Sequence, residues 1–215
     1  GKNGYHVVVF RDALLPGTCR RELLPLLEAE SGKTAGEDFG LCFHPEFLLP
    51  GTAVADYYAP PKTIIGAFDK KSGALLASLY ADMDIPITHT RLEAAEMVKY
   101  VDHAWLTMKS AFTHDIGALA QKADIDAHQL MKMFAEDARF HLSPDDFKPG
   151  FSLDGRNATS PTGEINRVAK TLRVKTPFLT TLEKNRRAPL EHAVGLIRKV
   201  GGKGGGRVAI LGGCG

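Results

Sequence analysis

One continuous helical pattern, from residue 90 to about residue 123, constrains this 215-residue chain more than any other feature. Thr90 and Glu93 form a capping box that marks the expected start of the helix. Most globular helices run three or four turns, so a helix of this length is typical of a strut that organises a domain. Lys99 and His103 lie four residues apart and are expected to project side by side. The apolar positions that recur at helical spacing are Ala94, Met97, Val98, Val101, Ala104, Trp105, Met108, Ala111, Phe112, Ile116 and Leu119.

Upstream of this helix, strand and helix patterns alternate, as they do in α/β folds. Helices are expected at 19–28 and 73–83. Pro25 should kink the first of them or shift its start, because proline lacks the N–H that an inner helical turn needs. The expected strands are 5–10, 39–43, 63–68 and 86–88. We therefore expect a partial Rossmann-like α/β segment over residues 1–89.

Downstream, the pattern is almost wholly helical, which predicts a helical domain over residues 90–200. After it, residues 201–215 read as a glycine-rich linker and one further strand at 207–211. The additional helices are expected at 126–139, from 143 onwards, at 165–172 and at 190–200. The fold class is therefore the α/β remnant of a Rossmann sheet followed by an all-helical domain organised on one long helix.

The net charge, the cysteine count and the lengths of the apolar runs exclude several function classes. A formal net charge of +2, without a long Lys/Arg cluster, gives no argument for nucleic-acid binding. The cysteines, Cys19, Cys42 and Cys214, are odd in number and lack CxxC spacing, which favours a reduced compartment. No signal peptide and no apolar run of membrane-spanning length is visible. We therefore expect a cytoplasmic protein that does not act on nucleic acid or in a membrane.

Several phrases, in order along the chain, resemble those of the nucleotide-sugar 6-dehydrogenases, most closely the GDP-mannose 6-dehydrogenase branch of that family. The resemblance covers nearly the whole chain and weakens after Phe151. The phrases are LLPGT at 14–18, SGKTAGEDFG at 31–40, HPEFL at 44–48, TAVADY at 52–57, PPKTIIGAFDKKSG at 60–73, EAAEMVKY at 93–100 and PGF at 149–151.

This resemblance implies a domain order. The family has an N-terminal Rossmann domain that binds NAD, a central helical dimerisation domain and a C-terminal Rossmann domain for the nucleotide. By this comparison the chain contains the end of the first domain, the whole second domain, of the 6-phosphogluconate-dehydrogenase-like type, and the first strand of a truncated third. The resemblance also implies a homodimer through the 90–123 helix, where Trp105, Met108 and Phe112 form an apolar stripe.

The glycine fingerprint that binds NAD is missing from these residues. Such a fingerprint works between a strand and a helix N-terminus, where glycines let the pyrophosphate approach backbone N–H groups. The run at 201–206 precedes its strand, and the run at 208–215 ends before a helix could begin. We therefore do not expect this chain alone to bind NAD.

The family oxidises an alcohol to an acid through a covalent cysteine intermediate. The position of that cysteine falls here on Asn157, and an asparagine amide cannot form the intermediate. Lys99 matches the family's catalytic lysine, and Glu46 matches the glutamate of its PEF motif. His103 replaces the asparagine one turn after the lysine. We therefore predict a degenerate or truncated relative that does not oxidise a sugar by itself, so whether it is an enzyme stays open.

The residues that replace the family's catalytic residues leave several alternatives for the function of the chain. If the family's geometry holds, Asp12, His44, Glu46 and His103 meet in one cleft and could bind Zn²⁺ or Fe²⁺, which would suit a hydrolase or lyase acting on a sugar-like substrate. The same cleft could instead perform acid/base chemistry without a cofactor, with Lys99 stabilising an oxyanion. In a purely structural module, Lys99 would pair with Glu46 or Asp12. A last alternative is an active nucleotide-sugar dehydrogenase whose NAD domain is absent from this chain.

Overall fold

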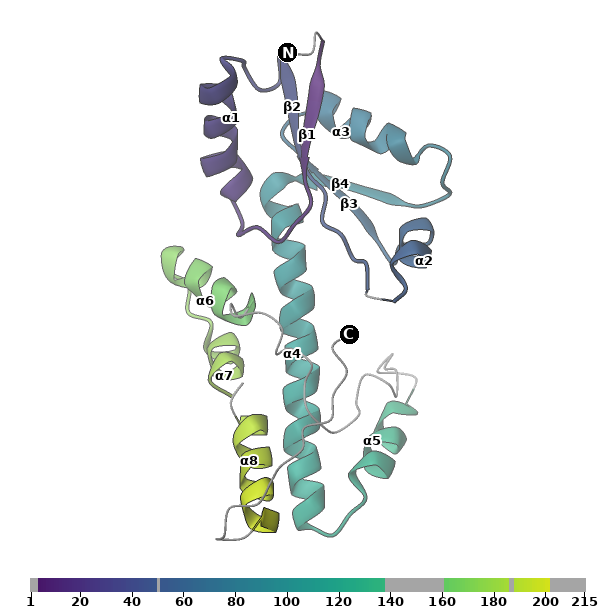
Figure 1. The fold of residues 1–215 in the computed structure, drawn as a ribbon, viewed down its shortest axis with the longest axis vertical. Helices are drawn as coiled ribbons and strands as arrows, with labels where there is room; N and C mark the ends of the chain where they lie inside the picture. Colours follow the sequence, from purple (N-terminus) through teal and green to yellow (C-terminus); the bar gives the residue numbers. More distant parts are fainter. Residues whose placement is uncertain (1–3, 50, 138–160, 186–187, 202–215) are drawn as a thin grey trace. The chain divides into compact units, whose positions relative to one another are not determined.

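The computed structural model describes residues 4–49, 51–137, 161–185 and 188–201 (Figure 1). The chain folds into two compact units, and the boundary between them lies between Val101 and Asp102. The first is an α/β unit, and the second is helical in all its described elements. The division falls inside the long helix, so the first turns of that helix group with the sheet. The fold class expected from the sequence is confirmed.

In the α/β unit, the described strands form one mixed sheet in the order β1-β2-β3-β4. β1 is parallel to β2, and β3 is parallel to β4, with His6 opposite Phe39 and Thr63 opposite Ile87. β2 and β3 are antiparallel, a reversal that the strand and helix pattern did not predict. The strands are β1 His6–Phe10, β2 Phe39–Phe43, β3 Thr63–Ala67 and β4 Ile87–Arg91.

Helices connect the two parallel pairs and cover the sheet (Figure 1). Between β1 and β2, a π-helical turn over Cys19–Leu23 leads into α1, Leu24–Ser31. Pro25 lies in the first turn of α1, where its missing N–H costs nothing, so the expected shift of the helix start is confirmed. Between β3 and β4, α3 spans Lys70–Ala77 and starts three residues earlier than predicted, because Asp69 caps it by accepting a hydrogen bond from the Ser72 N–H.

Apolar side chains pack on both faces of this sheet. Leu41 and Phe43 of β2 are fully buried on one face, against α1 and the start of the long helix. Cys42, between them in sequence, is buried on the opposite face with Leu76 of α3. This alternation is the two-residue period of a strand that is covered on both sides. β2 is therefore the centre of the α/β core.

The long helix α4 runs unbroken over Leu92–Lys122. The predicted capping box is wrong. Thr90 belongs to β4, where it pairs with Gly66, and the Glu93 carboxylate instead accepts a hydrogen bond from Arg20 Nε at 2.6 Å. The later start arises because β4 continues to Arg91 before the chain turns into the helix.

Shorter helices follow in the second unit. Asp126 caps α5 as predicted, by accepting hydrogen bonds from the N–H groups of His128 and Gln129. A helix at 177–185 was missed by the sequence analysis, and a six-residue helix, α2 Ala53–Tyr58, was missed in the first unit. The expected helix from 143 and the expected strand at 207–211 lie outside the described residues. The described helices are α5 Ala127–Ala135, α6 Pro161–Thr171, α7 Pro177–Asn185 and α8 Ala188–Gly201.

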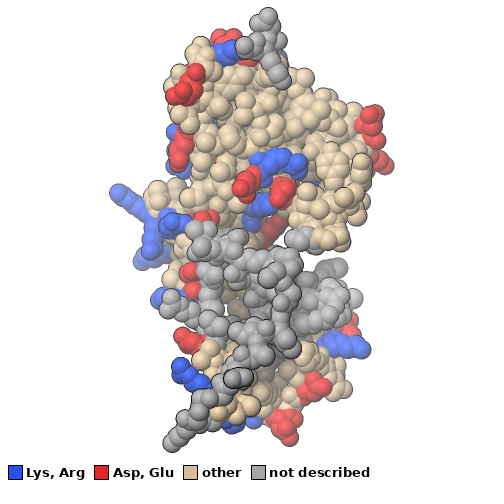
Figure 2. Space-filling model, viewed as in Figure 1, with Lys and Arg blue, Asp and Glu red and all other residues tan. Residues whose placement is uncertain are grey.

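Two surface properties bear on function. Within the described residues, no helix has the length and apolar character needed to cross a membrane. On the face shown in Figure 2, acidic and basic side chains are interspersed, and neither sign covers a large continuous area. The charge pattern on that face is therefore unlike the basic stripe of a nucleic-acid-binding domain.

Candidate functional site

The segment HPEF leaves the carboxyl end of β2 and carries the first group of predicted site residues. The N–H of His44 donates to the carbonyl of Phe10 at 2.8 Å, which continues the pairing of β1 with β2 by one residue. His44 and Pro45 are buried, whereas Glu46 is exposed. The segment is therefore anchored at its start and open to solvent at Glu46.

His44 is held from both sides of its ring. Nδ1 lies 2.8 Å from the carbonyl oxygen of Ile64, and Nε2 lies 2.7 Å from the hydroxyl of Tyr80. A neutral imidazole satisfies both contacts, with Nδ1–H donating to Ile64 and Nε2 accepting from Tyr80. Burial lowers the pKa of His44, and the positive charge of Arg11 lowers it further. His44 is therefore a neutral, fully hydrogen-bonded residue.

This geometry does not support the predicted metal site. Both ring nitrogens of His44 are engaged, so neither offers a lone pair to a metal ion. The Asp12 carboxylate accepts a hydrogen bond from the N–H of Ala13 at 2.7 Å. Across the described residues, no three His, Cys, Asp or Glu side chains are grouped closely enough to hold a metal. The set Asp12, His44, Glu46 and His103 therefore gains no support as a ligand set for Zn²⁺ or Fe²⁺.

Lys99 lies on α4 beside the HPEF segment. Its ammonium nitrogen is 5.9 Å from the ring centroid of Phe47, and that of Lys62 is 4.5 Å from the same ring. Such contacts place cations against the electron-rich face of an aromatic ring. The pairing of Lys99 with Glu46 or Asp12, expected for a purely structural module, is not seen. Lys99 therefore lies beside the segment that carries Glu46, but the two side chains do not form an ion pair.

His103 and Asn157 could not be grouped with these residues. His103 lies one turn beyond Lys99 on α4, in the part of the helix that belongs to the second unit. Its backbone carbonyl accepts a hydrogen bond from the Thr107 hydroxyl at 2.8 Å. Its convergence with Glu46 stays a prediction. Asn157 lies outside the described residues.

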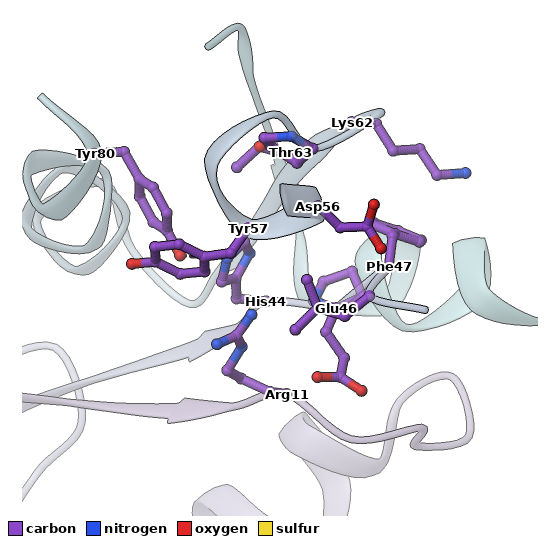
Figure 3. Close-up of a pocket in the computed structure, with 12 residues that line it drawn as sticks. Arg11, His44, Glu46, Phe47, Asp56, Tyr57, Lys62, Thr63 and Tyr80 are labelled. Carbon is purple, nitrogen blue, oxygen red and sulfur yellow. Dashed lines mark hydrogen bonds between the residues drawn. The ribbon is translucent and has the colours of Figure 1, made fainter. Parts of the chain in front are cut away.

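A pocket opens beside the HPEF segment, at the sheet edge where β1 and β2 end (Figure 3). Because β3 runs antiparallel to β2, its first residues also reach this edge. The antiparallel pair is thus the feature that brings Lys62 to the site. The polar and aromatic residues that line the pocket are Arg11, His44, Glu46, Phe47, Asp56, Tyr57, Lys62, Thr63 and Tyr80.

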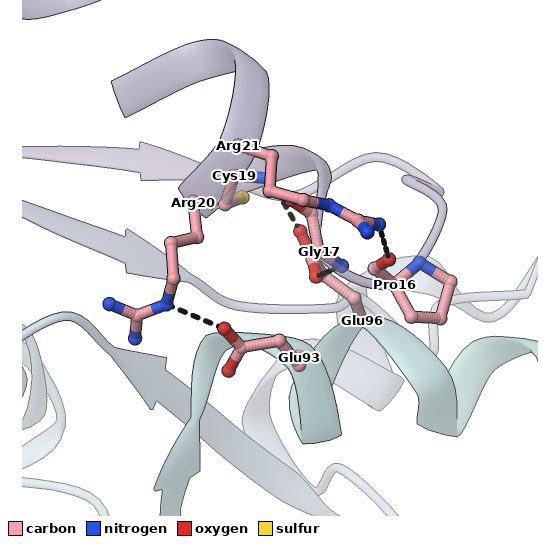
Figure 4. Close-up of polar contacts among 7 residues, drawn as sticks. All are labelled: Pro16, Gly17, Cys19, Arg20, Arg21, Glu93 and Glu96. Carbon is pink, nitrogen blue, oxygen red and sulfur yellow. Dashed lines mark hydrogen bonds and ion pairs between the residues drawn. The ribbon is translucent and has the colours of Figure 1, made fainter. Parts of the chain in front are cut away.

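A second polar cluster, which sequence reasoning missed, joins the PGTC turn to α4 (Figure 4). Glu96 is fully buried, and its carboxylate accepts hydrogen bonds from the N–H groups of Gly17 at 2.5 Å and Cys19 at 2.8 Å. Gly17 has φ +92°, which a residue with a side chain adopts only under strain. One signal was available, since Glu96 falls four residues after Leu92 on the apolar face of the helix.

The cysteines of the α/β unit are buried. Cys19 and Cys42 are both inaccessible to solvent. Burial, together with the Glu96 carboxylate, raises the pKa of Cys19 far above its ordinary value, and burial raises the pKa of Cys42 to about 12. Because the thiolate is the nucleophile, neither thiol is reactive in this fold.

Comparison with known proteins gives the family. Residues 2–84 match the NAD-binding domain of the UDP-glucose/GDP-mannose dehydrogenase family, and residues 93–187 match its central domain. The GDP-mannose 6-dehydrogenase of Azotobacter vinelandii is 36% identical over 98% of this chain and 48% of its own length. The chain belongs to the UDP-glucose/GDP-mannose dehydrogenase family.

Solved structures agree with this assignment. A UDP-glucose dehydrogenase from Pyrobaculum islandicum matches with a TM-score of 0.83 and 25% identity, over 92% of this chain and 45% of that one. A GDP-mannose dehydrogenase from Pseudomonas aeruginosa matches with a TM-score of 0.63 and 36% identity, over the same shares. The chain thus spans about half the length of these relatives. These relatives are dehydrogenases and lend no support to a hydrolase or lyase.

Proposed function

We propose that this chain binds a nucleotide sugar, or a sugar-like molecule, at the Glu46–Lys99 end of its α/β unit and does not itself oxidise it. The proposal rests chiefly on Asn157, the residue that the resemblance places at the position of the family's catalytic cysteine. A neutral carboxamide cannot add to the aldehyde intermediate and then leave on hydrolysis, as a thiol can. Without that step, oxidation to the acid has no route on this chain.

The two cysteine thiols of the α/β unit support the proposal that this chain does not oxidise its ligand. A substitute nucleophile needs access to substrate and a pKa near the working pH. Cys19 and Cys42 are buried, and the pKa of each is raised well above its ordinary value. Neither could replace the cysteine missing at position 157. Cys214 lies outside the described residues.

The binding half of the proposal rests on Lys99. Its ammonium group contacts the ring of Phe47, beside Glu46, and has no carboxylate partner among the described residues. A cation in that position is available for the negative charge of a phosphorylated sugar. What the relatives' names say they act on, GDP-mannose and UDP-glucose, supplies the first two ligands to test.

We predict that isothermal titration of the chain with GDP-mannose or UDP-glucose gives saturable binding to at least one of them. Replacing Lys99 with alanine should weaken that binding about tenfold or more, because a hydrogen bond to a charged group is worth roughly 1.5–3 kcal/mol. Lys33→Ala, at an exposed position outside the pocket, is the matched control and should change nothing. Absence of binding to both nucleotide sugars would contradict the proposal that the ligand is a nucleotide sugar.

The long helix suggests a partner as well. Trp105 and Phe112 of α4, two turns apart on the helix, remain 52% and 42% exposed, and large apolar side chains that gather on one exposed face mark interaction surfaces. We propose that a second copy of this chain covers them, as the resemblance to a dimerisation domain implies. Burying each large side chain would contribute about 1.5–3 kcal/mol.

Light scattering on a size-exclusion column should therefore give the mass of a dimer at micromolar concentration. The double change Trp105→Glu and Phe112→Glu should convert it to a monomer, since two charges would have to be buried in the interface. Leu26→Glu, at a 57% exposed position on α1, serves as the control and should leave the dimer intact. A wild-type monomer would count against the proposal.

A further inference from the structure

Arg11 is an uncompensated cation in the pocket. It follows β1 directly, and its guanidinium points toward His44 and Tyr57 in Figure 3. Its positive charge favours a lower pKa at His44 and partly offsets the rise that burial causes in the pKa of Tyr80. It forms no hydrogen bond or ion pair with any residue of the described ranges. The guanidinium fork is therefore available to a ligand.

The floor of the pocket cannot supply a counter-charge. His44 is buried and neutral, with both ring nitrogens engaged, and the Tyr80 hydroxyl is committed to His44 Nε2. Burial also raises the pKa of Tyr80, so its hydroxyl stays protonated at neutral pH. The wall beside the floor includes the aromatic rings of Phe47 and Tyr57. A neutral floor with aromatic walls suits a compact polar molecule that has an apolar face, such as a sugar ring.

The two acids of the pocket do not neutralise Arg11. Asp56 accepts hydrogen bonds from the N–H of Leu49 at 2.9 Å and from the hydroxyl of Thr52 at 2.8 Å, which ties it to its own loop. Glu46 is exposed, and its carboxylate is turned away from His44 in Figure 3. Arg11 is thus free to pair with an oxyanion. Arg11 offers one positive charge, which a singly charged carboxylate matches in a bidentate pair with the guanidinium fork.

We propose that this pocket binds the carboxylate of a small sugar acid, and that Arg11 selects the acid over the neutral sugar. The proposal rests on the proposed function for the sugar-like nature of the ligand. It goes beyond that function in assigning the ligand a carboxylate and in giving Arg11 the role of specificity-determining residue. Arg11 pairs with the carboxylate while the rings of Phe47 and Tyr57 border the sugar.

The test is an NMR titration of the isotope-labelled chain with D-glucuronate, D-mannuronate, D-glucose and D-mannose at constant ionic strength. The acids should bind about tenfold more tightly than the neutral sugars, as expected for a charge-assisted hydrogen-bonded pair. Arg11→Gln should remove this preference, and Arg11→Lys should retain part of it, because lysine keeps the charge but lacks the fork. Arg198→Gln, at an exposed position on α8, is the matched control and should change nothing.

Equal affinity for acids and neutral sugars would overturn the inference, as would an unchanged preference in a folded Arg11→Gln variant. Binding of glucose 6-phosphate as tight as that of glucuronate would overturn the choice of a carboxylate. GDP-mannose binding separates this inference from the proposed function. If GDP-mannose binds through Lys99 while the acid preference is absent, this inference alone fails. If the acids are preferred but no nucleotide sugar binds, the nucleotide-sugar part of the proposed function fails and this inference stands.

Discussion

Replacement of Glu96 with alanine is expected to lower the free energy of unfolding by about 3 kcal/mol. The carboxylate is fully buried and accepts the N–H groups of Gly17 and Cys19, at the start of the π-helical turn (Figure 4). Its loss would leave both donors buried without acceptors, and an unsatisfied buried donor costs about 1–3 kcal/mol. Urea denaturation followed by circular dichroism measures the change through the transition midpoint.

Two further variants separate this effect from a general charge effect. Glu96→Gln keeps one acceptor oxygen of the two and should lose about half as much stability. Glu93→Gln removes the ion pair with Arg20, whose side chains are 44% and 29% exposed. Exposed ion pairs contribute about 0–1 kcal/mol, so this control should stay within that range. Equal losses for Glu93→Gln and Glu96→Ala would contradict the role of Glu96 as the buried cap.

Gly66→Ala is expected to cost about 2–3 kcal/mol through overpacking. Gly66 lies in β3 where the strand passes the start of α4. An added Cβ would lie 2.5 Å from the Cβ of Ala95, 3.0 Å from the carbonyl oxygen of Arg91 and 3.1 Å from the Cα of Leu92. Two of these atoms are backbone, so the strain cannot be relieved by a side-chain rotation. Thermal unfolding monitored by circular dichroism should show a clear fall in Tm.

Gly195→Ala is the matched control for that change. Gly195 lies within α8, and a Cβ there would meet nothing within 4 Å. Alanine favours a helix over glycine by about 0.8–1 kcal/mol, so this variant should be neutral or more stable. If Gly66→Ala were as benign as Gly195→Ala, the close approach of β3 to α4 would be wrong.

Most of the architecture could be predicted from periodicity. The apolar repeat at three and four residues predicted an unbroken α4, and the valine-rich β1 and the apolar β2 predicted strands. Turn chemistry marked some ends correctly, such as Asp126 before α5. It failed at Thr90, because strand pairing with Gly66 carried β4 past the capping box. Local sequence signals therefore predict which helices and strands form, but they predict less well where an element ends when strand pairing sets its end.

The site was harder to predict, because its decisive contacts join residues far apart in sequence. His44 carries the chemistry of a metal ligand, but its hydrogen bonds to Ile64 and Tyr80 depend on the reversal between β2 and β3. Glu96 meets Gly17 across 79 residues. Neither partner could be identified from spacing along the chain. Lys99 lies near Phe47, the residue after Glu46, and the expectation that Lys99 and Glu46 share one site came from the family resemblance and stays a prediction.

The chain belongs to a dehydrogenase family, and we propose that it does not oxidise a nucleotide sugar by itself. The most direct test is to incubate the purified chain with NAD and either GDP-mannose or UDP-glucose, and to follow NADH by its absorbance. An active dehydrogenase of the family, assayed in parallel, verifies the conditions. No NADH above the enzyme-free background is expected with either substrate. NADH formation that depends on the nucleotide sugar and is lost in Lys99→Ala would show that the chain is an active dehydrogenase.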